Sequence, residues 1–275
     1  MISALLLLLT GPKVDLDVVY SKVAGEELKM DVYSPATTTG KAPCLIVIHG
    51  GAWIAGNRQD MKELCEAAAS KGFVAATVQY RLAPKHKWPA MLDDVQTAVR
   101  YLRKNADKYI IDPNRMAASG ASAGGHLSLL LGYRDTRDPK PSEFPGVSSQ
   151  VKAVLDIFGP TDLAKDYPPT FDFLFASVLG KPKKDSAEDI KQASPVTFLS
   201  SKSSPTFIIH GTNDQVVPIM QSKRLVDLLT AANVPVEAVY IEGMGHEDGG
   251  KDEGRRKQFR DAIEKGLNFV LSKLK

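Results

Sequence analysis

Short apolar runs that alternate with amphipathic stretches restrict the fold this chain can form. The run Cys44–Ile48 (CLIVI) is apolar throughout and lies between a proline and a glycine, which is typical of a strand buried on both faces of a parallel sheet. Further strands are expected at Phe73–Val78, Arg115–Ser119, Val151–Phe158, Thr206–Ile209 and Val236–Ile241. Helices are expected at Gln59–Lys71, Pro89–Ala106, Ser122–Tyr133, Met220–Ala232 and Asp252–Leu274.

The order of these elements predicts the fold class. Leu16–Lys22 and Glu27–Tyr33 alternate apolar and polar residues around Ala24-Gly25, as in an antiparallel hairpin. The remaining alternation of strands and helices predicts an α/β fold, with a mostly parallel eight-stranded sheet and helices on both faces. Residues 160–204 interrupt the alternation and are rich in Pro, Lys and Phe. We expect one domain over residues 1–275, with 160–204 as a small cap insertion.

Charge and cysteine content exclude several classes of protein. The 35 basic and 32 acidic residues are too nearly balanced to suggest a nucleic-acid partner. Two cysteines, Cys44 and Cys65, make neither a disulfide-rich scaffold nor a metal cluster. They are two buried thiols or one bridge, and the sequence alone leaves both open. Nothing in the sequence indicates an oligomeric state.

The N-terminal segment Met1–Leu9 (MISALLLLL) is apolar but too short to span a bilayer. It resembles the core of a signal peptide, although no basic residue precedes it and no clear cleavage site follows. It is either a truncated signal peptide or a buried segment. We favour the first, and therefore an exported protein over a cytoplasmic one. No second apolar run is long enough for a membrane span.

A G-x-S-x-G motif follows the strand Arg115–Ser119 and begins the next helix. Its serine is Ser122, in the order Gly120-Ala121-Ser122-Ala123-Gly124. Between a strand and a helix, this motif forms the sharp turn that presents a nucleophilic hydroxyl above a sheet. We expect side chains in place of the two glycines to collide with neighbouring elements. The motif therefore predicts a serine hydrolase with Ser122 as its nucleophile.

The loop His49-Gly50-Gly51-Ala52-Trp53 follows the first buried strand, where such hydrolases carry backbone N–H donors for an oxyanion. We assign this role to the N–H groups of Gly51 and Ala52, together with that of Ala123. Trp53 is interpreted as a substrate-binding residue, although simple packing explains it equally well. His49 is expected to make structural hydrogen bonds.

A serine nucleophile needs a general base and an acid that orients it. His246 follows the last strand in a glycine-rich loop, and Asp214 follows the strand before it, which gives the order Ser, acid, His. The other histidines are expected to be structural: His86 in a polar loop, His126 on the helix after Ser122, and His210 at a strand end. Asp156 and Asp162 are also expected to be structural.

These segments resemble a known family. The matching motifs are HGGAW (His49–Trp53), YRLAP (Tyr80–Pro84), GASAGGHL (Gly120–Leu127), GPTDL (Gly159–Leu163), HGTNDQVVP (His210–Pro218) and GHEDG (Gly245–Gly249). Together they resemble the esterase and lipase branch of the α/β-hydrolase fold over roughly Val14 to Phe269. The chain is most similar to hormone-sensitive-lipase-like esterases and, among them, to bacterial feruloyl and acetylxylan esterases.

The resemblance implies that the family's nucleophile, acid and base fall on Ser122, Asp214 and His246, and its oxyanion donors on Gly51, Ala52 and Ala123. Ala52 stands where the family usually has a third glycine. The short cap implies short or compact acyl groups. The expected activity is hydrolysis of short-chain or aromatic acyl esters by a Ser-His-Asp triad, without metal or organic cofactor. The resemblance implies a small-molecule or oligosaccharide substrate, such as acetyl or feruloyl esters of plant polysaccharide. A peptidase, an arylformamidase or a catalytically silent binding protein are the alternatives.

Overall fold

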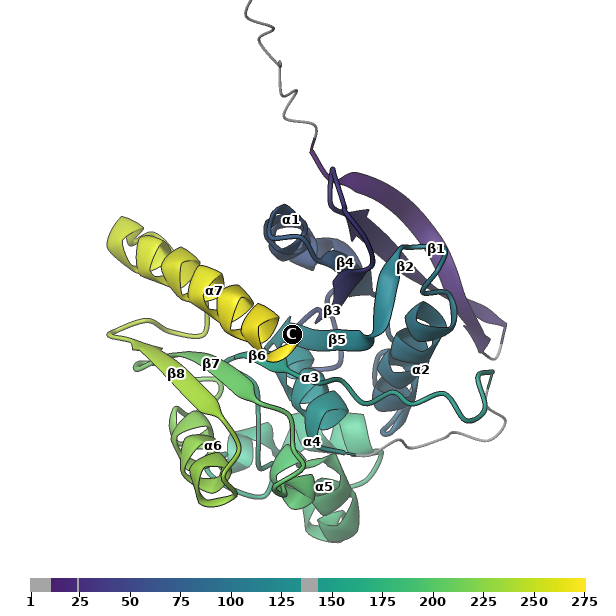
Figure 1. Cartoon of the computed structure of the whole chain (residues 1–275). Helices are drawn as coiled ribbons and strands as arrows, with labels where there is room; N and C mark the ends of the chain where they lie inside the picture. The colour runs from purple at the N-terminus through teal and green to yellow at the C-terminus, as the bar shows by residue number, and fades with distance from the viewer. Residues whose placement is uncertain (1–10, 24, 135–142) are drawn as a thin grey trace, which may run out of the picture.

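Eight strands form a single sheet in the computed structural model, which describes residues 11–23, 25–134 and 143–275 (Figure 1). The strands are β1 (Lys13–Val23), β2 (Glu26–Ser34), β3 (Ala42–Ile48), β4 (Val74–Val78), β5 (Ile111–Ala121), β6 (Val154–Ile157), β7 (Thr206–Gly211) and β8 (Val236–Ile241). Their order in the sheet is β1-β2-β4-β3-β5-β6-β7-β8. β1 and β2 are antiparallel to their neighbours, and all pairs from β4 to β8 are parallel. The predicted fold class is confirmed.

Helices cover both faces of the sheet, as predicted. They are α1 (Lys62–Ser70), α2 (Ala90–Lys104), α3 (Ala123–Tyr133), α4 (Asp172–Leu179), α5 (Ala187–Ala193), α6 (Met220–Ala231) and α7 (Glu253–Lys273). Apolar residues of α2, α3 and α6 fill one core, and those of α1 and α7 fill a second core on the opposite face (Figure 1). Burial of these apolar residues on both faces is the main force that holds the layers together.

The two cysteines lie on opposite sides of the sheet. Cys44 of β3 belongs to the core under α2 and α3, whereas Cys65 belongs to the core under α1. Both are free and buried, and burial raises the pKa of the Cys44 thiol to about 12. The alternative of two buried thiols is therefore the one observed.

Several predicted elements differ in extent from those observed, as β5 does, which extends beyond the predicted Arg115–Ser119 at both ends. β6 begins at Val154 rather than Val151, because the Val151 N–H donates to the carbonyl of Leu131 at the end of α3. The predicted helix Gln59–Lys71 is divided into a 3₁₀ turn, Arg58–Met61, and α1. Asn57 and Asp60 form a capping box that starts the 3₁₀ turn.

The segment 160–204 lies over the carboxyl end of the sheet and consists of short helices. It contains α4, α5 and three 3₁₀ turns, Pro169–Phe171, Lys183–Asp185 and Pro195–Phe198. Gln221, at the start of α6, holds the first part of this segment. Its fully buried amide accepts from the N–H groups of Thr161 and Asp162 and donates to the carbonyls of Asp162 and Lys165. The base of the cap is thus fixed to the core of the fold.

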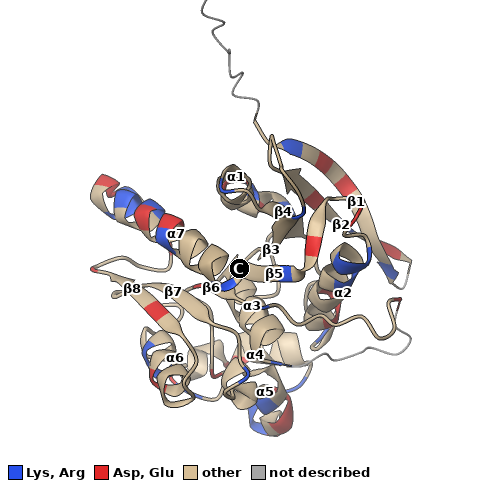
Figure 2. Ribbon diagram, viewed as in Figure 1, with Lys and Arg blue, Asp and Glu red and all other residues tan. Residues whose placement is uncertain are grey.

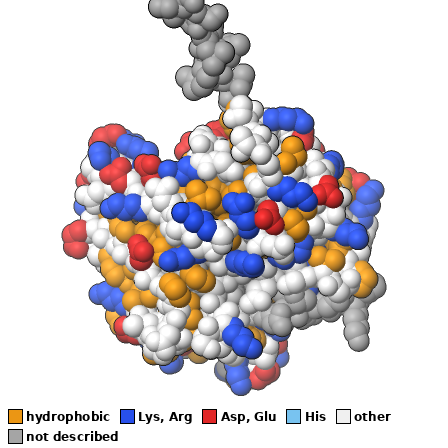
Figure 3. Space-filling view, in the orientation of Figure 1, with side chains coloured by type: hydrophobic (Ala, Val, Ile, Leu, Met, Phe, Trp, Pro, Cys, Tyr) orange, Lys and Arg blue, Asp and Glu red, His pale blue; other side chains and the backbone are white. Residues whose placement is uncertain are grey.

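Charged side chains lie mainly at the outer ends and faces of the elements, with both signs interspersed (Figure 2). On the face shown in Figure 3, basic, acidic and apolar side chains are intermixed. Among the residues described, no helix combines the length and the apolar character needed to cross a bilayer. The segment Met1–Leu9 lies outside the described residues, so the signal-peptide interpretation stays a prediction.

Candidate active site

Ser122 lies at a strained turn between β5 and α3. Its φ of 56° and ψ of −119° lie in a region that non-glycine residues seldom occupy. The Ser122 N–H donates to the carbonyl of Ile157 at 2.9 Å, which ties the turn to β6. A Cβ on Gly120 would lie 2.5 Å from the Ile48 oxygen, and one on Gly124 would lie 2.0 Å from the same atom. Both glycines are therefore required by close backbone approach, as the sequence predicts.

The structure brings Ser122, His246 and Asp214 together above the carboxyl edge of the sheet. His246 Nε2 lies 2.8 Å from Ser122 Oγ, and His246 Nδ1 lies 2.7 Å from Asp214 Oδ2. The Asp214 side chain is fully buried, and 17% of the His246 side chain is exposed. With Nδ1–H donating to the carboxylate, Nε2 faces the hydroxyl as an acceptor. This arrangement is able to remove a proton from Ser122.

Asp214 is held in place by its own loop as well as by His246. Its Oδ1 accepts from the N–H groups of Val216 at 2.8 Å and Val217 at 2.9 Å. Burial opposes ionisation of this carboxyl, but hydrogen bonds from His210 and His246 outweigh burial and hold the pKa of Asp214 well below its usual range. The acid is therefore a carboxylate at neutral pH. The two backbone donors could not be inferred from sequence.

The loop after β3 passes close to the nucleophile. A Cβ on Gly50 would lie 2.9 Å from the Ala121 oxygen and 3.4 Å from Ser122 Cβ. Positive φ values at Gly51 (105°), Ala52 (52°) and Trp53 (61°) turn this backbone sharply. Tyr80 donates from its hydroxyl to the His49 carbonyl at 3.1 Å and stacks on the His49 ring. His49 is thus a structural residue of the loop.

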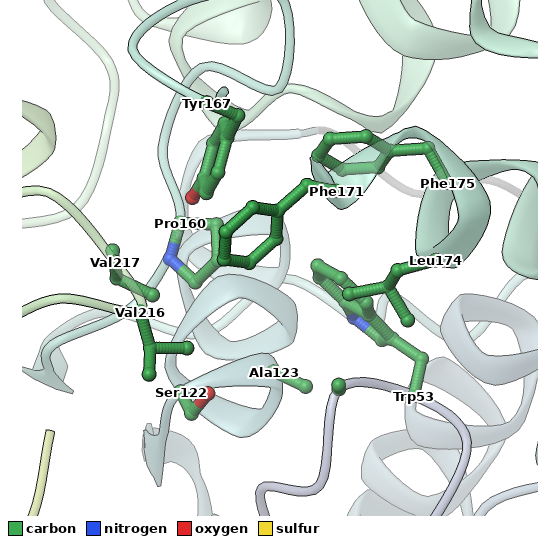
Figure 4. A pocket seen from close by; sticks show the side chains of 11 residues that line it. Trp53, Ser122, Ala123, Pro160, Tyr167, Phe171, Leu174, Phe175, Val216 and Val217 are labelled. Atoms are coloured by element: carbon green, nitrogen blue, oxygen red, sulfur yellow. The ribbon is translucent and has the colours of Figure 1, made fainter. Parts of the chain in front are cut away.

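A small apolar pocket adjoins Ser122, with a volume of about 30 Å³. Ser122 and Ala123 lie at one end of it, and Tyr167, Phe171 and Phe175 of the cap lie opposite (Figure 4). The rest of the lining consists of Ala52, Trp53, Pro160, Leu174, Val216 and Val217. Ala52, Ala123 and Trp53 of the predicted site line this pocket, whereas Gly51 lies outside its lining. The cap residues of the pocket were not predicted.

Trp53 is held by His126 of α3, a contact that was not predicted. The Trp53 Nε1–H donates to His126 Nδ1 at 3.2 Å, and His126 Nε2 lies 2.6 Å from the Ala193 carbonyl at the end of α5. Burial lowers the pKa of His126 to about 4, so its ring is neutral at neutral pH. His126 therefore connects the pocket wall at Trp53 to the cap.

Asp156 lies at the end of β6, below the turn at Ser122. It is fully buried, and its Oδ1 accepts from the Gly159 N–H at 3.0 Å. A Cβ on Gly125 would lie 2.3 Å from this oxygen, so Asp156 packs directly against the start of α3. Burial raises the pKa of Asp156 to about 7.

His86, the remaining histidine, contacts Glu26 and none of the site residues described above.

The strand order and the strained serine turn at the carboxyl edge of the sheet define an α/β-hydrolase. Comparison with known proteins then places the chain more narrowly. Residues 30–229 match the model of the BD-FAE family, and the chain belongs to this family.

Individual relatives and solved structures agree with this assignment. Esterase LipC of Mycobacterium tuberculosis is 36% identical over 216 residues, which cover 76% of this chain and 53% of LipC. A truncated carbohydrate esterase from gut microbiota superposes with a TM-score of 0.78 at 28% identity, covering 94% of this chain and all of that one. The esterase Est2 of the planctomycete Thermogutta terrifontis gives a TM-score of 0.81 at 26% identity, covering 95% and 92%. The chain spans about half the length of the curated relatives it matches.

Proposed function

We propose that this chain is a serine carboxylic ester hydrolase in which Ser122 is the nucleophile, His246 the general base and Asp214 the orienting acid. One observation carries the proposal: an unbroken hydrogen-bonded series of 2.7 Å and 2.8 Å from Asp214 through His246 to Ser122. The esterase relatives support the same reaction class.

In the proposed reaction, Ser122 Oγ attacks the ester carbonyl carbon while His246 Nε2 takes the hydroxyl proton. The carbonyl π electrons move to oxygen, and the tetrahedral intermediate collapses as His246 returns the proton to the leaving alcohol. Water, deprotonated by His246, then attacks the acyl-serine and releases the acid. The Asp214 carboxylate stabilises the imidazolium in both steps and keeps its own charge, consistent with its low pKa.

The N–H groups of Gly51, Ala52 and Ala123 are the proposed donors to the oxyanion. Ala123 is the first residue of α3, so its N–H has no partner within the helix. Within the described part of the chain, the N–H groups of Gly51 and Ala52 have no protein acceptor. The partial positive charge at the start of α3 adds to the stabilisation of a negative oxygen beside Ser122. Loss of one such donor typically costs about 10²–10³ in rate.

The pocket supports a short acyl group. A cavity must offer roughly 10–15 Å³ to hold one water molecule. The pocket, with a volume of about 30 Å³, therefore accepts two or three non-hydrogen atoms of a substrate. An acetyl group, with three non-hydrogen atoms, meets this limit. A propionyl group meets it when its carbonyl oxygen lies at the proposed oxyanion donors, whereas a feruloyl group does so only if Phe171 and Leu174 move. Est2 has been solved with propionate and with butyrate bound. With a carbohydrate esterase among the similar structures, we propose acetylated oligosaccharide as the substrate class.

The experiment that tests this function compares the chain with its Ser122→Ala variant on p-nitrophenyl esters of increasing acyl length, with acetylated xylan and methyl ferulate alongside. We expect acetate and propionate to give the highest kcat/KM, and Ser122→Ala to lose about 10⁶ in kcat. Ser177→Ala, which removes a cap hydroxyl outside the pocket, is the control. Retention of full activity by Ser122→Ala would contradict the mechanism. An inert parent chain would favour a silent binding protein.

A further inference from the structure

A second histidine contacts the carboxylate that orients His246. His210 Nε2 lies 3.2 Å from Asp214 Oδ2, the same oxygen that His246 Nδ1 contacts at 2.7 Å. The side chains of His210 and Asp214 are both fully buried. Phe158 packs against both imidazole rings, with centroid distances of 6.4 Å to His210 and 4.6 Å to His246. The buried Asp214 carboxylate thus lies between two imidazoles.

The contacts of His210 fix the position of its proton. Nε2 faces two atoms that can only accept, Asp214 Oδ2 and the Val217 carbonyl at 2.9 Å, so it must carry hydrogen. Nδ1 lies 2.6 Å from the Ser222 hydroxyl of α6, which can donate to it. The ring is therefore held on both edges, from the Asp214 loop and from α6.

The donors around Asp214 match its capacity to accept. Oδ1 receives the N–H groups of Val216 and Val217, and Oδ2 receives the Nδ1–H of His246 and a share of the Nε2–H of His210, which also donates to the Val217 carbonyl. An ionised carboxylate has about four lone-pair positions, so each faces a donor. Without His210, Oδ2 would keep one donor, and the carboxylate could turn about its Cβ–Cγ bond away from His246. A shift of this kind displaces the imidazole from the serine hydroxyl.

We infer that His210 is a positioning residue: its Nε2–H holds Asp214 Oδ2 in the orientation that directs His246 Nε2 at Ser122. This inference rests on the proposed function, because it assigns a role within the same reaction. His210 is absent from the pocket lining and touches no substrate position, so its effect is expected on kcat rather than KM.

Two substitutions separate this role from simple packing. His210→Gln places an amide N–H near the position of Nε2 and keeps a donor to Asp214. The shorter asparagine of His210→Asn places its amide near the position of Nδ1. This variant keeps the contact with Ser222 but has no donor to Asp214 Oδ2. We expect His210→Asn to lose about 10- to 100-fold in kcat on p-nitrophenyl acetate, the scale of a small misplacement of a reacting group, with KM changed by less than about threefold. His210→Gln should restore most of this loss.

Equal kcat values for the two variants, whether high or low, would overturn the inference, because a packing role does not depend on which edge of the ring is replaced. Thermal unfolding checks that both variants fold. If His210→Asn does not fold, ¹⁵N NMR of the histidine rings in the unmodified chain decides, with the His210 signals assigned by their loss in His210→Gln. The inference requires a proton on His210 Nε2, and an Nε2 without hydrogen would refute it.

The two proposals fail in different ways. An unmodified chain that cleaves no ester removes the proposed function and, with it, any role of His210 in that reaction. If the unmodified chain is active but His210→Gln and His210→Asn have the same kcat, only the proposed role of His210 is refuted.

Discussion

Two buried groups close to Gly125, the next residue His126 and Asp156 of β6, should give the stability of this chain opposing pH dependences. Burial lowers the pKa of His126 to about 4, against about 6.5 in an unfolded chain. Between these values the unfolded state binds more protons than the folded state, so the stabilising contribution is complete above pH 6.5 and is lost as the pH falls towards 4. Burial raises the pKa of Asp156 from 3.8 to about 7, so its contribution is complete near pH 3.8 and is lost as the pH rises through 7.

The size of each effect follows from the same pKa values. One pKa unit corresponds to about 1.4 kcal/mol, so between pH 5 and pH 6.5 each group changes the free energy of unfolding by about 2 kcal/mol. The signs are opposite: His126 makes the fold more stable as the pH rises, and Asp156 makes it less stable. In the unmodified chain the two contributions nearly cancel over this range.

Replacing either group should expose the pH dependence of stability that comes from the other group. In His126→Asn the free energy of unfolding should fall by about 2 kcal/mol from pH 5 to pH 6.5, and in Asp156→Asn it should rise by about the same amount. Chemical unfolding followed by tryptophan fluorescence at several pH values measures both slopes. The comparison uses slopes, so a constant loss of stability from either substitution does not affect it. Slopes of the same sign in the two variants would refute the reasoning.

Two further substitutions test the site. Gly124→Ala puts a methyl group 2.0 Å from the carbonyl oxygen of Ile48, so it should lower the melting temperature and reduce kcat/KM by at least about 100-fold. Gly40→Ala, with open space around it, is the control. A fully active Gly124→Ala would be inconsistent with the tight turn. Phe171→Ala should enlarge the acyl pocket and raise the ratio of hexanoate to acetate kcat/KM by about tenfold. The exposed neighbour Phe173 gives the control, since its alanine variant should keep the original ratio.

Much of the fold could be predicted because the buried strands read as continuous apolar runs. All seven residues of β3 are buried. A strand covered on both faces is apolar at every position, so its sequence shows a continuous apolar run rather than an alternation of apolar and polar residues. Strand ends were less predictable. The start of β6 is set by a hydrogen bond between Val151 and Leu131, a tertiary contact that carries no local signal. Boundaries of this kind depend on which backbone groups meet in the fold.

The proximity of Ser122, Asp214 and His246 could be predicted because each follows a strand at the same sheet edge. The surroundings of these residues could not. From its place at a strand end, His210 is predicted only to be structural, and the fold is needed to place its Nε2 beside the Asp214 carboxylate. Phe171 of the pocket comes from the cap, where short helical turns lack any strong periodicity.

Ser122 is proposed to be a nucleophile activated by His246, and paraoxon probes this role because it phosphorylates reactive serine hydroxyls. Est2, a structural neighbour, has been solved in a form phosphorylated by paraoxon. The measurement is intact-protein and peptide mass spectrometry after brief exposure of the parent chain and Ser122→Ala. We expect one diethylphosphoryl group on the peptide that contains Ser122 and none on the variant. An unmodified parent chain, or an equal adduct on the variant, would contradict it.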